Sequence, residues 1–328
     1  MLTTPEKLQA ILDDAVASGE EHACQLAVYC DGELFCDLAA GAAEVRTIFP
    51  LFSAGKGVLI TAILRLVERG ILELDAPVAR YWSEFAANGK ERITLRDVLT
   101  HRSGMHILPP ASFAEQADWD HMCGLLASRR PVGIPGTRTR YHALTFAWLA
   151  GEVAARAAGK PVSEVVRDEV LTPAGIDDFG YGVSLADEAR TLPVFHRPED
   201  ADAWLVRFIG DEHIRRACIP AANAFGTARA LAKHYMAVLD NLLSPEMLME
   251  ALTPPDRSAD PVRGWERFGL GYILWDGGAF GHGGALGAEG FAVPERRLAV
   301  GFATDTLAPA HPVRDRISEA LGLPPRRW

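Results

Sequence analysis

Residues 51–57 read Leu-Phe-Ser-Ala-Gly-Lys-Gly and lead directly into the apolar stretch Val-Leu-Ile-Thr-Ala-Ile-Leu at 58–64. Apolar residues recur at spacings of three and four from Val58 to Val67, which is typical of a helix with one buried face. Ser53 stands at the start of this pattern, and Gly70 follows its end. The stretch therefore predicts a buried helix that begins at Ser53 and stops before Gly70.

Ser53 and Lys56 are three residues apart, so they project from the same face of the predicted helix, where Oγ and Nζ can meet. The N–H groups and positive potential of a helix N-terminus favour an alkoxide on Ser53 and a neutral amine on Lys56. The pair thus predicts a serine nucleophile with its own base. An ordinary N-cap serine followed by a solvated lysine would give the same tetrapeptide, so the rest of the chain has to decide.

The composition indicates a folded globular protein. The chain has 328 residues, of which 48% are hydrophobic and 23% charged, enough for a large core in one or two domains. Its net charge of −10 argues against nucleic acid or an anionic membrane as a partner. It contains no run of about 18 apolar residues, and residues 1–7 lack the pattern of a secretory signal. We therefore expect a cytoplasmic protein with no nucleic-acid and no membrane partner.

The residues that commonly hold metals or nucleotides do not form their usual motifs. Cys24, Cys30 and Cys36 have a spacing of six, which fits neither a zinc ribbon nor a C-x-x-C pair, so we expect them to pack as small apolar residues. None of the ten histidines lies in an H-E-x-x-H motif, and the glycine-rich residues 277–287 match no phosphate-binding loop. The sequence predicts no metal and no cofactor.

Strand-like patterns lie near both ends of the sequence, and helix-like patterns lie between them. Strands are predicted at 25–29 and 34–39, joined at Asp31-Gly32, and again at 268–275, 287–293 and 298–304. Helices are predicted at 5–18, 94–101, 112–130, 145–158, 162–171, 227–243 and 312–321, besides the one that begins at Ser53. Thr94 and Asp97 have the form of a capping box. Residues 193–224 show no clear pattern.

These elements predict an α+β fold, an α/β sandwich in which both ends of the chain share one antiparallel sheet. The first and last helices are expected to flank the sheet, with an all-helical region inserted. We place the α/β part at about 1–75 and 226–328, and the helical part at about 76–225, of a single domain (1–328). A ligand cleft is expected between the two parts, and Ser53 lies at their border.

Four motifs along the chain carry a resemblance to a known family. Residues 53–56 have the form of an S-x-x-K box, and residues 99–104 read Leu-Thr-His-Arg-Ser-Gly. Residues 135–137 (Pro-Gly-Thr) precede Tyr-His-Ala at 141–143, and His-Gly-Gly follows at 282–284. Their order and spacing are similar to the S-x-x-K, L-T-H-x-S-G, Y-x-N and K-T-G motifs of the serine β-lactamase and penicillin-binding-protein superfamily. The H-G-G in place of K-T-G resembles the esterases built on the class C β-lactamase fold, the family VIII carboxylesterases.

The resemblance implies a β-lactamase-like serine hydrolase that forms an acyl-enzyme on Ser53. Lys56 and Tyr141 would carry the acid–base work, and the sequence does not decide which of them removes the serine proton. The backbone N–H groups of Ser53 and Ala285 would form the oxyanion hole. Four further residues are implied beside the substrate, namely His142, His282, Gly283 and Gly284.

Two departures from the β-lactamase pattern narrow the reaction. Ala143 stands where β-lactamases have the Asn that binds the side-chain amide of the drug, and His282 replaces the Lys that attracts its carboxylate. Both changes weaken β-lactam binding but leave acyl transfer possible, so we predict an esterase acting on a small-molecule ester or acyl substrate. An acyltransferase, an amide or β-lactam hydrolase and a non-catalytic acyl-ligand-binding protein are the alternatives. Trp119, Trp204 and Trp265 lie in segments that could wall the cleft, and no oligomeric state is predicted.

Overall fold

A helix and a β-hairpin come first along the chain, in a computed structural model that describes residues 3–200, 203–255 and 267–324. Helix α1 (Pro5–Ala17) is followed by β1 (Ala23–Cys30) and β2 (Glu33–Gly41). Asp31 and Gly32 join the two strands with φ of 51° and 88°, the left-handed conformation that a two-residue type I′ turn requires. The hairpin predicted at Asp31-Gly32 is confirmed.

The main sheet has seven antiparallel strands in the order β2-β1-β10-β9-β8-β7-β6. Its later strands are β6 (Arg267–Phe268), β7 (Ile273–Leu274), β8 (Phe280–Gly283), β9 (Glu289–Val293) and β10 (Leu298–Thr304). Strand β1 pairs with β10 from Cys24 opposite Thr304 to Cys30 opposite Leu298, so both ends of the chain share the sheet, as predicted.

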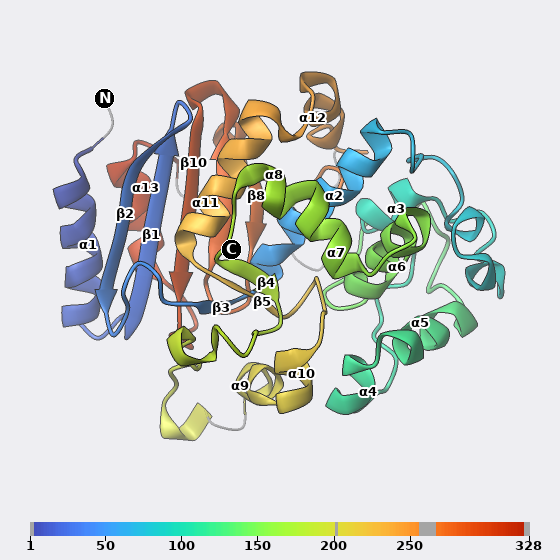
Figure 1. Cartoon of the computed structure of the whole chain (residues 1–328), viewed down its shortest axis with the longest axis horizontal. Coiled ribbons are helices and arrows are strands. Elements are labelled where there is room, and N and C mark those ends of the chain that lie inside the picture. Colours follow the sequence, from blue (N-terminus) through green and yellow to red (C-terminus); the bar gives the residue numbers. More distant parts are fainter. Residues whose placement is uncertain (1–2, 201–202, 256–266, 325–328) are drawn as a thin grey trace.

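Helices cover both faces of this sheet (Figure 1). Helices α1 and α13 (Pro312–Ala320) pack together on one face, and α11 (Ala228–Ala237) lies on the other. Alternate residues of β1 enter the two cores, with Leu26 facing α1 and α13, and Ala27 facing α11. Gly301 on β10 allows α11 to approach closely, because a Cβ there would lie 2.0 Å from the carbonyl oxygen of Ala228.

A further group of helices lies around the sheet, and in Figure 1 those at 95–158 lie to its right, those at 204–216 below it and the one at 245–251 above it. These helices are α2 (Lys56–Glu68), α3 (Leu95–Leu99), α4 (Phe113–Ala117), α5 (Trp119–Ser128), α6 (Phe146–Ala158), α7 (Val162–Val166), α8 (Thr172–Ala174), α9 (Trp204–Gly210), α10 (Glu212–Arg216) and α12 (Pro245–Ala251). The capping box predicted at Thr94 and Asp97 starts α3. The predicted α+β class, an antiparallel sheet packed against the terminal helices, is confirmed.

A second, small sheet was not predicted from the sequence. It consists of β3 (Phe49–Phe52), β5 (Ala224–Gly226) and β4 (Phe179–Tyr181), in the order β3-β5-β4. Strands of three or four residues are too short to show a period of two, so their pairing leaves no pattern in the sequence. The sheet brings the residue after β3, Ser53, close to the residues that precede β5.

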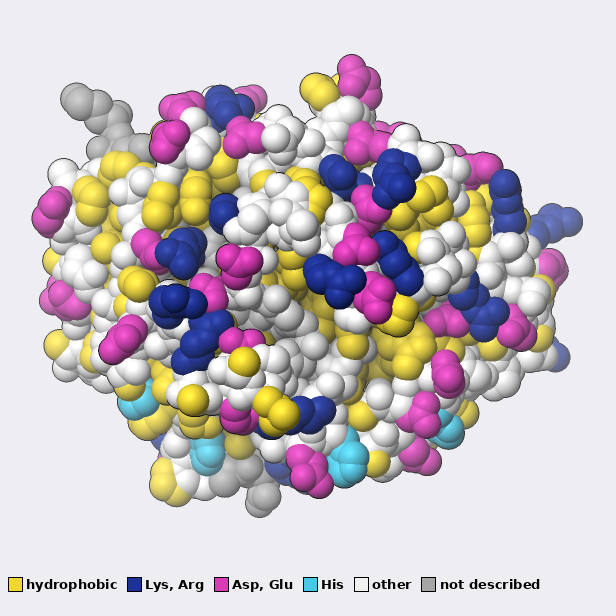
Figure 2. All heavy atoms as spheres, in the orientation of Figure 1, with side chains coloured by type: hydrophobic (Ala, Val, Ile, Leu, Met, Phe, Trp, Pro, Cys, Tyr) yellow, Lys and Arg dark blue, Asp and Glu magenta, His cyan; other side chains and the backbone are white. Residues whose placement is uncertain are grey.

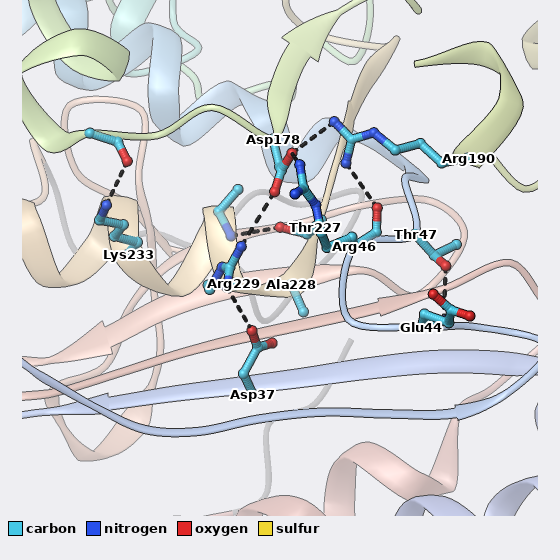
Figure 3. Close-up of polar contacts among 12 residues, drawn as sticks. Asp37, Glu44, Arg46, Thr47, Asp178, Arg190, Thr227, Ala228, Arg229 and Lys233 are labelled. Carbon is cyan, nitrogen blue, oxygen red and sulfur yellow. Dashed lines mark hydrogen bonds and ion pairs between the residues drawn. The ribbon is translucent and has the colours of Figure 1, made fainter. Parts of the chain in front are cut away.

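Charged side chains tie this small sheet to the main sheet (Figure 3). The Asp178 carboxylate, next to β4, lies 2.7 Å from Arg190, 3.4 Å from Arg229 on α11 and 3.8 Å from Arg46 before β3. Arg229 also contacts Asp37 on β2 at 3.1 Å. Asp178 is buried and the Arg229 side chain is 35% exposed, and these pairs connect the strand before Ser53 to α11 and β2.

Two predicted elements are wrong in detail. The strand predicted at 268–275 is the pair β6 and β7, because the chain reverses between them at Gly271 (φ 88°), where Ile60 leaves no room for a side chain. The helix predicted at 112–130 breaks at Asp118, whose side chain caps α5 by accepting from the N–H of His121. The segment 193–224, read as irregular, contains the short helices α9 and α10.

Charged side chains of both signs lie on the surface, and the helices are short. On the face shown in Figure 2, acidic and basic side chains are interspersed and form no extended patch of one sign. Within residues 3–200, 203–255 and 267–324, every helix falls short of the length and apolarity that a bilayer crossing demands. All five cysteines are free thiols.

Candidate active site

Ser53 lies on a strained turn between β3 and α2. The preceding residue, Phe52, has φ 49° and ψ −130°, a conformation that is costly for a bulky side chain and is concentrated at functional sites. Ser53 begins a single 3₁₀ turn, Ser53–Gly55, before the α-helix starts at Lys56. The helix ends at Glu68, ahead of Gly70, whose φ is 69°. The predicted buried helix is thus confirmed, with a tighter first turn that half-exposes Ser53.

The two glycines of this stretch are required by what packs against them. A Cβ on Gly55 would lie 2.2 Å from the Cβ of Ala224 on β5, and a Cβ on Gly57 would lie 2.2 Å from the hydroxyl of Tyr235. The Tyr181 hydroxyl donates to the carbonyl oxygen of Gly55 at 2.9 Å. The turn that carries Ser53 is therefore fixed against β4, β5 and α11 by direct backbone contact.

The amine of Lys56 lies 2.8 Å from Ser53 Oγ, and the whole side chain is buried. It also donates to the carbonyl oxygen of Ala143 at 2.8 Å and to that of Ala221 at 2.6 Å. Ser53 Oγ in turn lies 3.0 Å from the Ala221 carbonyl. The sequence-predicted contact between Ser53 and Lys56 is therefore present in the structure.

This arrangement is compatible with either protonation state of Lys56. A neutral amine has two N–H bonds, which satisfy the carbonyls of Ala143 and Ala221 and leave its lone pair for the Ser53 hydroxyl proton. An ammonium has three N–H bonds and donates to both carbonyls and to Ser53 Oγ, which then accepts a hydrogen bond from it. A proton can thus pass between Ser53 and Lys56 without any heavy atom moving, which is the preorganisation that acid–base catalysis needs.

Tyr141 lies beside this pair. The Lys56 amine is 5.0 Å from the centre of the Tyr141 ring, and the ring stacks on Phe268 of β6 at 5.7 Å. His101, within the motif at 99–104, packs edge-on against the same ring at 5.0 Å. The carbonyl oxygen of His101 accepts from the N–H of Arg140 at 2.8 Å, so the backbone on either side of Tyr141 is tied to that motif.

His142 lies behind the cavity wall. It is fully buried, and its Nδ1 donates to the carbonyl oxygen of Arg140 at 2.7 Å, so Nε2 accepts from the Ser103 hydroxyl at 2.7 Å. Burial lowers the pKa of His142 to about 3, which keeps the ring neutral. The structure therefore assigns His142 to holding the Tyr141 segment in place, whereas the sequence analysis expected it beside the substrate.

The residues at 282–285 form the opposite wall. His282, Gly283, Gly284 and Ala285 all line the cavity that contains Ser53 and Tyr141. Gly284 packs on β3, because a Cβ there would lie 2.2 Å from the carbonyl oxygen of Leu51. The Gly284 N–H donates to the carbonyl oxygen of Ala288 at 2.7 Å, which closes a turn, and Ala285 in this turn lines the same cavity as Ser53.

The cavity between these walls has a volume of about 360 Å³. Apolar side chains make up the rest of its lining, namely Phe52, Ala143, Leu144, Trp204, Leu205, Ala222 and Ile273. Of the three tryptophans considered from the sequence, Trp204 lines the cavity, Trp119 instead donates to Glu152 at 2.6 Å, and Trp265 lies outside the described residues. In the part of the chain that the structure describes, no group of three or more His, Cys, Asp or Glu is placed to hold a metal ion.

Comparison with known proteins places this fold and site in a family. The family described as Beta-lactamase matches residues 8–322. The chain belongs to the beta-lactamase family. The resemblance inferred from the four motifs is thereby confirmed, and in this beta-lactamase-family chain three of those motifs line a single cavity while the fourth supports its Tyr141 wall.

Relatives of this beta-lactamase-family chain include proteins named as esterases. The esterase/beta-lactamase LipL of Mycobacterium tuberculosis (strain ATCC 25618 / H37Rv) is 33% identical over 325 residues, covering 84% of this chain and 75% of LipL. Esterase EstB of Burkholderia gladioli is 29% identical over 309 residues, covering 81% of this chain and 77% of EstB. The crystal structure of a family VIII carboxylesterase matches with a TM-score of 0.90 at 27% identity and covers 98% of both chains.

Several features of this beta-lactamase-family site were not found by sequence reasoning. The carbonyls of Ala143 and Ala221 orient the Lys56 amine, but a backbone carbonyl has no sequence signature. The strain at Phe52 is equally invisible, because any residue type can be forced into such a conformation by its surroundings. The side chains of Leu144 and Ile273 are ordinary apolar residues whose place in the wall follows only from the tertiary fold.

Proposed function

We propose that this chain is a serine hydrolase that cleaves carboxylic esters through an acyl-enzyme on Ser53. The observation that carries the proposal is the contact of 2.8 Å between Ser53 Oγ and the buried Lys56 amine, at the edge of a cavity that Tyr141 also lines. Serine is a poor nucleophile unless a base in hydrogen-bond reach accepts its proton. Lys56 meets that requirement, and we assign it as the base in acylation.

The reaction then follows from the positions of these groups. Ser53 Oγ attacks the ester carbonyl carbon, and its proton passes to Lys56 Nζ. The oxyanion of the tetrahedral intermediate accepts from the backbone N–H groups of Ser53 and Ala285. Tyr141 passes a proton to the departing alcohol, and later removes one from the water that hydrolyses the acyl-enzyme. When the bond between the acyl group and Ser53 Oγ breaks, Lys56 returns its proton to Oγ, so the site regains its initial state.

The cavity lining favours an uncharged substrate. Among its described residues, Ser53, Tyr141 and His282 supply the polar side chains, and the remaining side chains are apolar. A substrate carboxylate, as in a β-lactam, would be buried there without a cationic partner, because His282 stands in place of a Lys. Ala143 likewise offers no side-chain hydrogen bond to an amide. The name of EstB, an esterase, supports an ester substrate, whereas LipL is named for both esterase and beta-lactamase.

The test combines covalent labelling with a comparison of substrates. A fluorophosphonate probe should add one label to the intact protein, on Ser53, and Ser53→Ala should lose both the label and ester turnover while remaining folded. Against p-nitrophenyl acetate and butyrate, kcat/KM should exceed that for nitrocefin by about 100-fold or more, since two polar contacts to the β-lactam are missing. Labelling of another residue, or a nitrocefin value that equals the ester values, would refute the proposal.

A further inference from the structure

A buried pair of side chains lies directly behind the turn that carries Ala285. His311, at the start of α13, donates from Nδ1 to the Glu21 carboxylate at 2.7 Å. The other oxygen of Glu21 accepts from the Thr304 hydroxyl at 2.5 Å. The side chains of Glu21 and His311 are only 0% and 4% exposed, so the contact between them is buried and is not a surface ion pair. Such a pair costs desolvation energy and is weak evidence for stability alone.

His311 is in contact with one residue of the turn, Gly287. A Cβ on Gly287 would lie 2.4 Å from both Cδ2 and Nε2 of the His311 ring, so the ring edge rests on the glycine α-carbon. Gly287 has φ 99°, which a residue with a side chain adopts only under strain. The Arg314 guanidinium donates to the Gly287 carbonyl oxygen at 3.1 Å. The glycine is thus held from two sides by residues of the last helix and the loop before it.

Gly287 in turn fixes the backbone of Ala285. Its N–H donates to the carbonyl oxygen of Gly284 at 3.0 Å, and the N–H of Gly284 donates to Ala288 at 2.7 Å. These two bonds close the turn around Ala285. Gly284, the residue before Ala285, also packs against β3. The direction of the Ala285 N–H therefore depends on the position of Gly287.

We propose that Glu21 and His311 are positioning residues of the oxyanion site, which hold Gly287 so that the Ala285 N–H points at the developing oxyanion. This inference rests on the proposed function. An oxyanion donor acts only if its direction is set before the reaction. A rigid support behind the turn supplies that constraint, since the ring of His311 can neither rotate away from Glu21 nor move past Gly287.

The chain provides a matched control for this pair. His22 donates from Nδ1 to Asp305 at 2.7 Å, the same distance as in the His311–Glu21 pair, and Asp305 follows the same strand, β10. The His22 ring, however, stacks on Phe195 at 4.0 Å. His22 is more exposed than His311, with 36% against 4% of the side chain accessible, but it has the same kind of bond to a carboxylate. His22→Asn therefore removes a carboxylate-bonded histidine whose contacts are with Asp305, Thr306 and Phe195 and not with the turn at 284–288.

The test uses His311→Asn, in which the amide can keep the bond to Glu21 but no ring edge reaches Gly287. With p-nitrophenyl butyrate, kcat per fluorophosphonate-titrated site should fall about 10- to 100-fold with KM within about threefold, as expected for a misdirected oxyanion donor. The rate ratio between this ester and its thionoester, whose sulfur is a weaker acceptor, should fall about fivefold or more. Glu21→Gln should change both values in the same direction, and His22→Asn should change neither by more than about twofold.

The outcomes separate this inference from the proposed function. A wild-type protein without Ser53-dependent ester hydrolysis would refute both. Wild-type hydrolysis together with an unchanged kcat in His311→Asn, or a lowered kcat with an unchanged ester-to-thionoester ratio, would refute the positioning role alone. An equal loss in His22→Asn would also refute it, because the effect would then reflect general stability. If His311→Asn does not fold, Glu21→Gln decides by the same ratio.

Discussion

Lys56 and Lys90 are both fully buried, but they differ in the partners of their amines. The Lys90 amine donates to three backbone carbonyl oxygens, those of Ala87 at 2.7 Å, Ala127 at 2.8 Å and Arg129 at 2.5 Å. The Lys56 amine donates to the carbonyl oxygens of Ala143 and Ala221 and also contacts the hydroxyl of Ser53. Three carbonyls require three N–H bonds, whereas two carbonyls and a hydroxyl can be satisfied by a neutral amine. The contact with a hydroxyl distinguishes Lys56 from Lys90, and under the proposed function it makes Lys56 the proton acceptor.

Replacing Lys56 with methionine should therefore mainly affect catalysis, and replacing Lys90 should affect only stability. Lys56→Met removes the proposed base and should lower kcat about 1000-fold or more. It also leaves the carbonyls of Ala143 and Ala221 without their donor, so the free energy of unfolding should fall by about 2 kcal/mol. Lys90→Met leaves three carbonyls without their donor, of which that of Ala127 is buried and the other two are part-buried, and should lower the free energy of unfolding by about 2–3 kcal/mol. Urea unfolding and ester kinetics on both variants measure this. A Lys90→Met protein that loses as much kcat per folded molecule as Lys56→Met would contradict the assignment.

Lys56 and Tyr141 should act as one proton-transfer unit. Because they share a step, Lys56→Ala and Tyr141→Phe should each lower kcat/KM, and the double variant should be little worse than the slower single variant. A double-variant cycle on one ester measures the coupling. Lys56→Arg serves as the control for charge, and it should not restore activity because a guanidinium does not release its proton. Strictly additive losses would show that the two residues act in separate steps.

The close approach of Gly55 to Ala224 predicts a compensating pair of substitutions. Gly55→Ala puts a methyl group 2.2 Å from the Cβ of Ala224, so the turn carrying Ser53 has to shift, which should cost about 100-fold in kcat. Removing the opposing methyl in Gly55→Ala/Ala224→Gly should recover part of that loss. Gly124→Ala is the control, since a Cβ there meets nothing within 4 Å and lies on helix α5. It should stabilise the protein by about 0.5–1 kcal/mol and leave kcat unchanged.

Stability should fall between neutral and acidic pH because of buried histidines. Burial lowers the pKa of both His142 and His234 to about 3, well below the ordinary value of about 6.5. Between these values the unfolded chain binds protons that the folded chain does not, so the free energy of unfolding decreases as the pH falls. Each histidine should contribute about 2 kcal/mol to the loss between pH 7.5 and 5.

Urea unfolding of His234→Gln at pH 7.5 and pH 5 isolates one of these contributions. Glutamine does not titrate but can still hydrogen-bond to Thr61, the partner of His234 at 2.8 Å. The pH-dependent loss should therefore be smaller by about 2 kcal/mol than in the wild type. His121→Gln on the exposed side of α5 is the control, and the wild-type difference should persist in it. An unchanged difference in His234→Gln would contradict the expected proton linkage.

The sequence was sufficient for the sheet ends and for the contact between Ser53 and Lys56. Alternation and the Asp31-Gly32 turn predict the first hairpin because both are local effects of the backbone. The contact between Ser53 and Lys56 was predicted because a spacing of three residues in a helix places both side chains on one face. The pairing of β1 with β10 was predicted only in outline, since no local pattern specifies which residues face each other.

Other parts depend on contacts between segments far apart in the sequence. The position of His142 could not be predicted, because it depends on whether the ring or the neighbouring Tyr141 faces the cavity, and Ser103 and Arg140 decide that. The break at Gly271 was missed for the same reason, since Ile60 on α2 determines that only a glycine fits. Such features reflect tertiary packing, which overrides short-range periodicity.

The pairing of β1 with β10 has a consequence for how the protein folds during its synthesis. These strands pair residues 24–30 with residues 298–304, which lie near opposite ends of the chain. Such long-range contacts slow folding, because a very long loop has to close before the β1–β10 hydrogen bonds can form. A nascent chain on the ribosome acquires Ser53, Lys56 and Tyr141 early, but β1 has no β10 to pair with until residues 298–304 are made. Until then β1 presents an unpaired edge that chaperones would recognise. The proposed hydrolytic activity should therefore appear only after nearly the whole chain has been synthesised, so that Ser53 is not reactive while the chain is still on the ribosome.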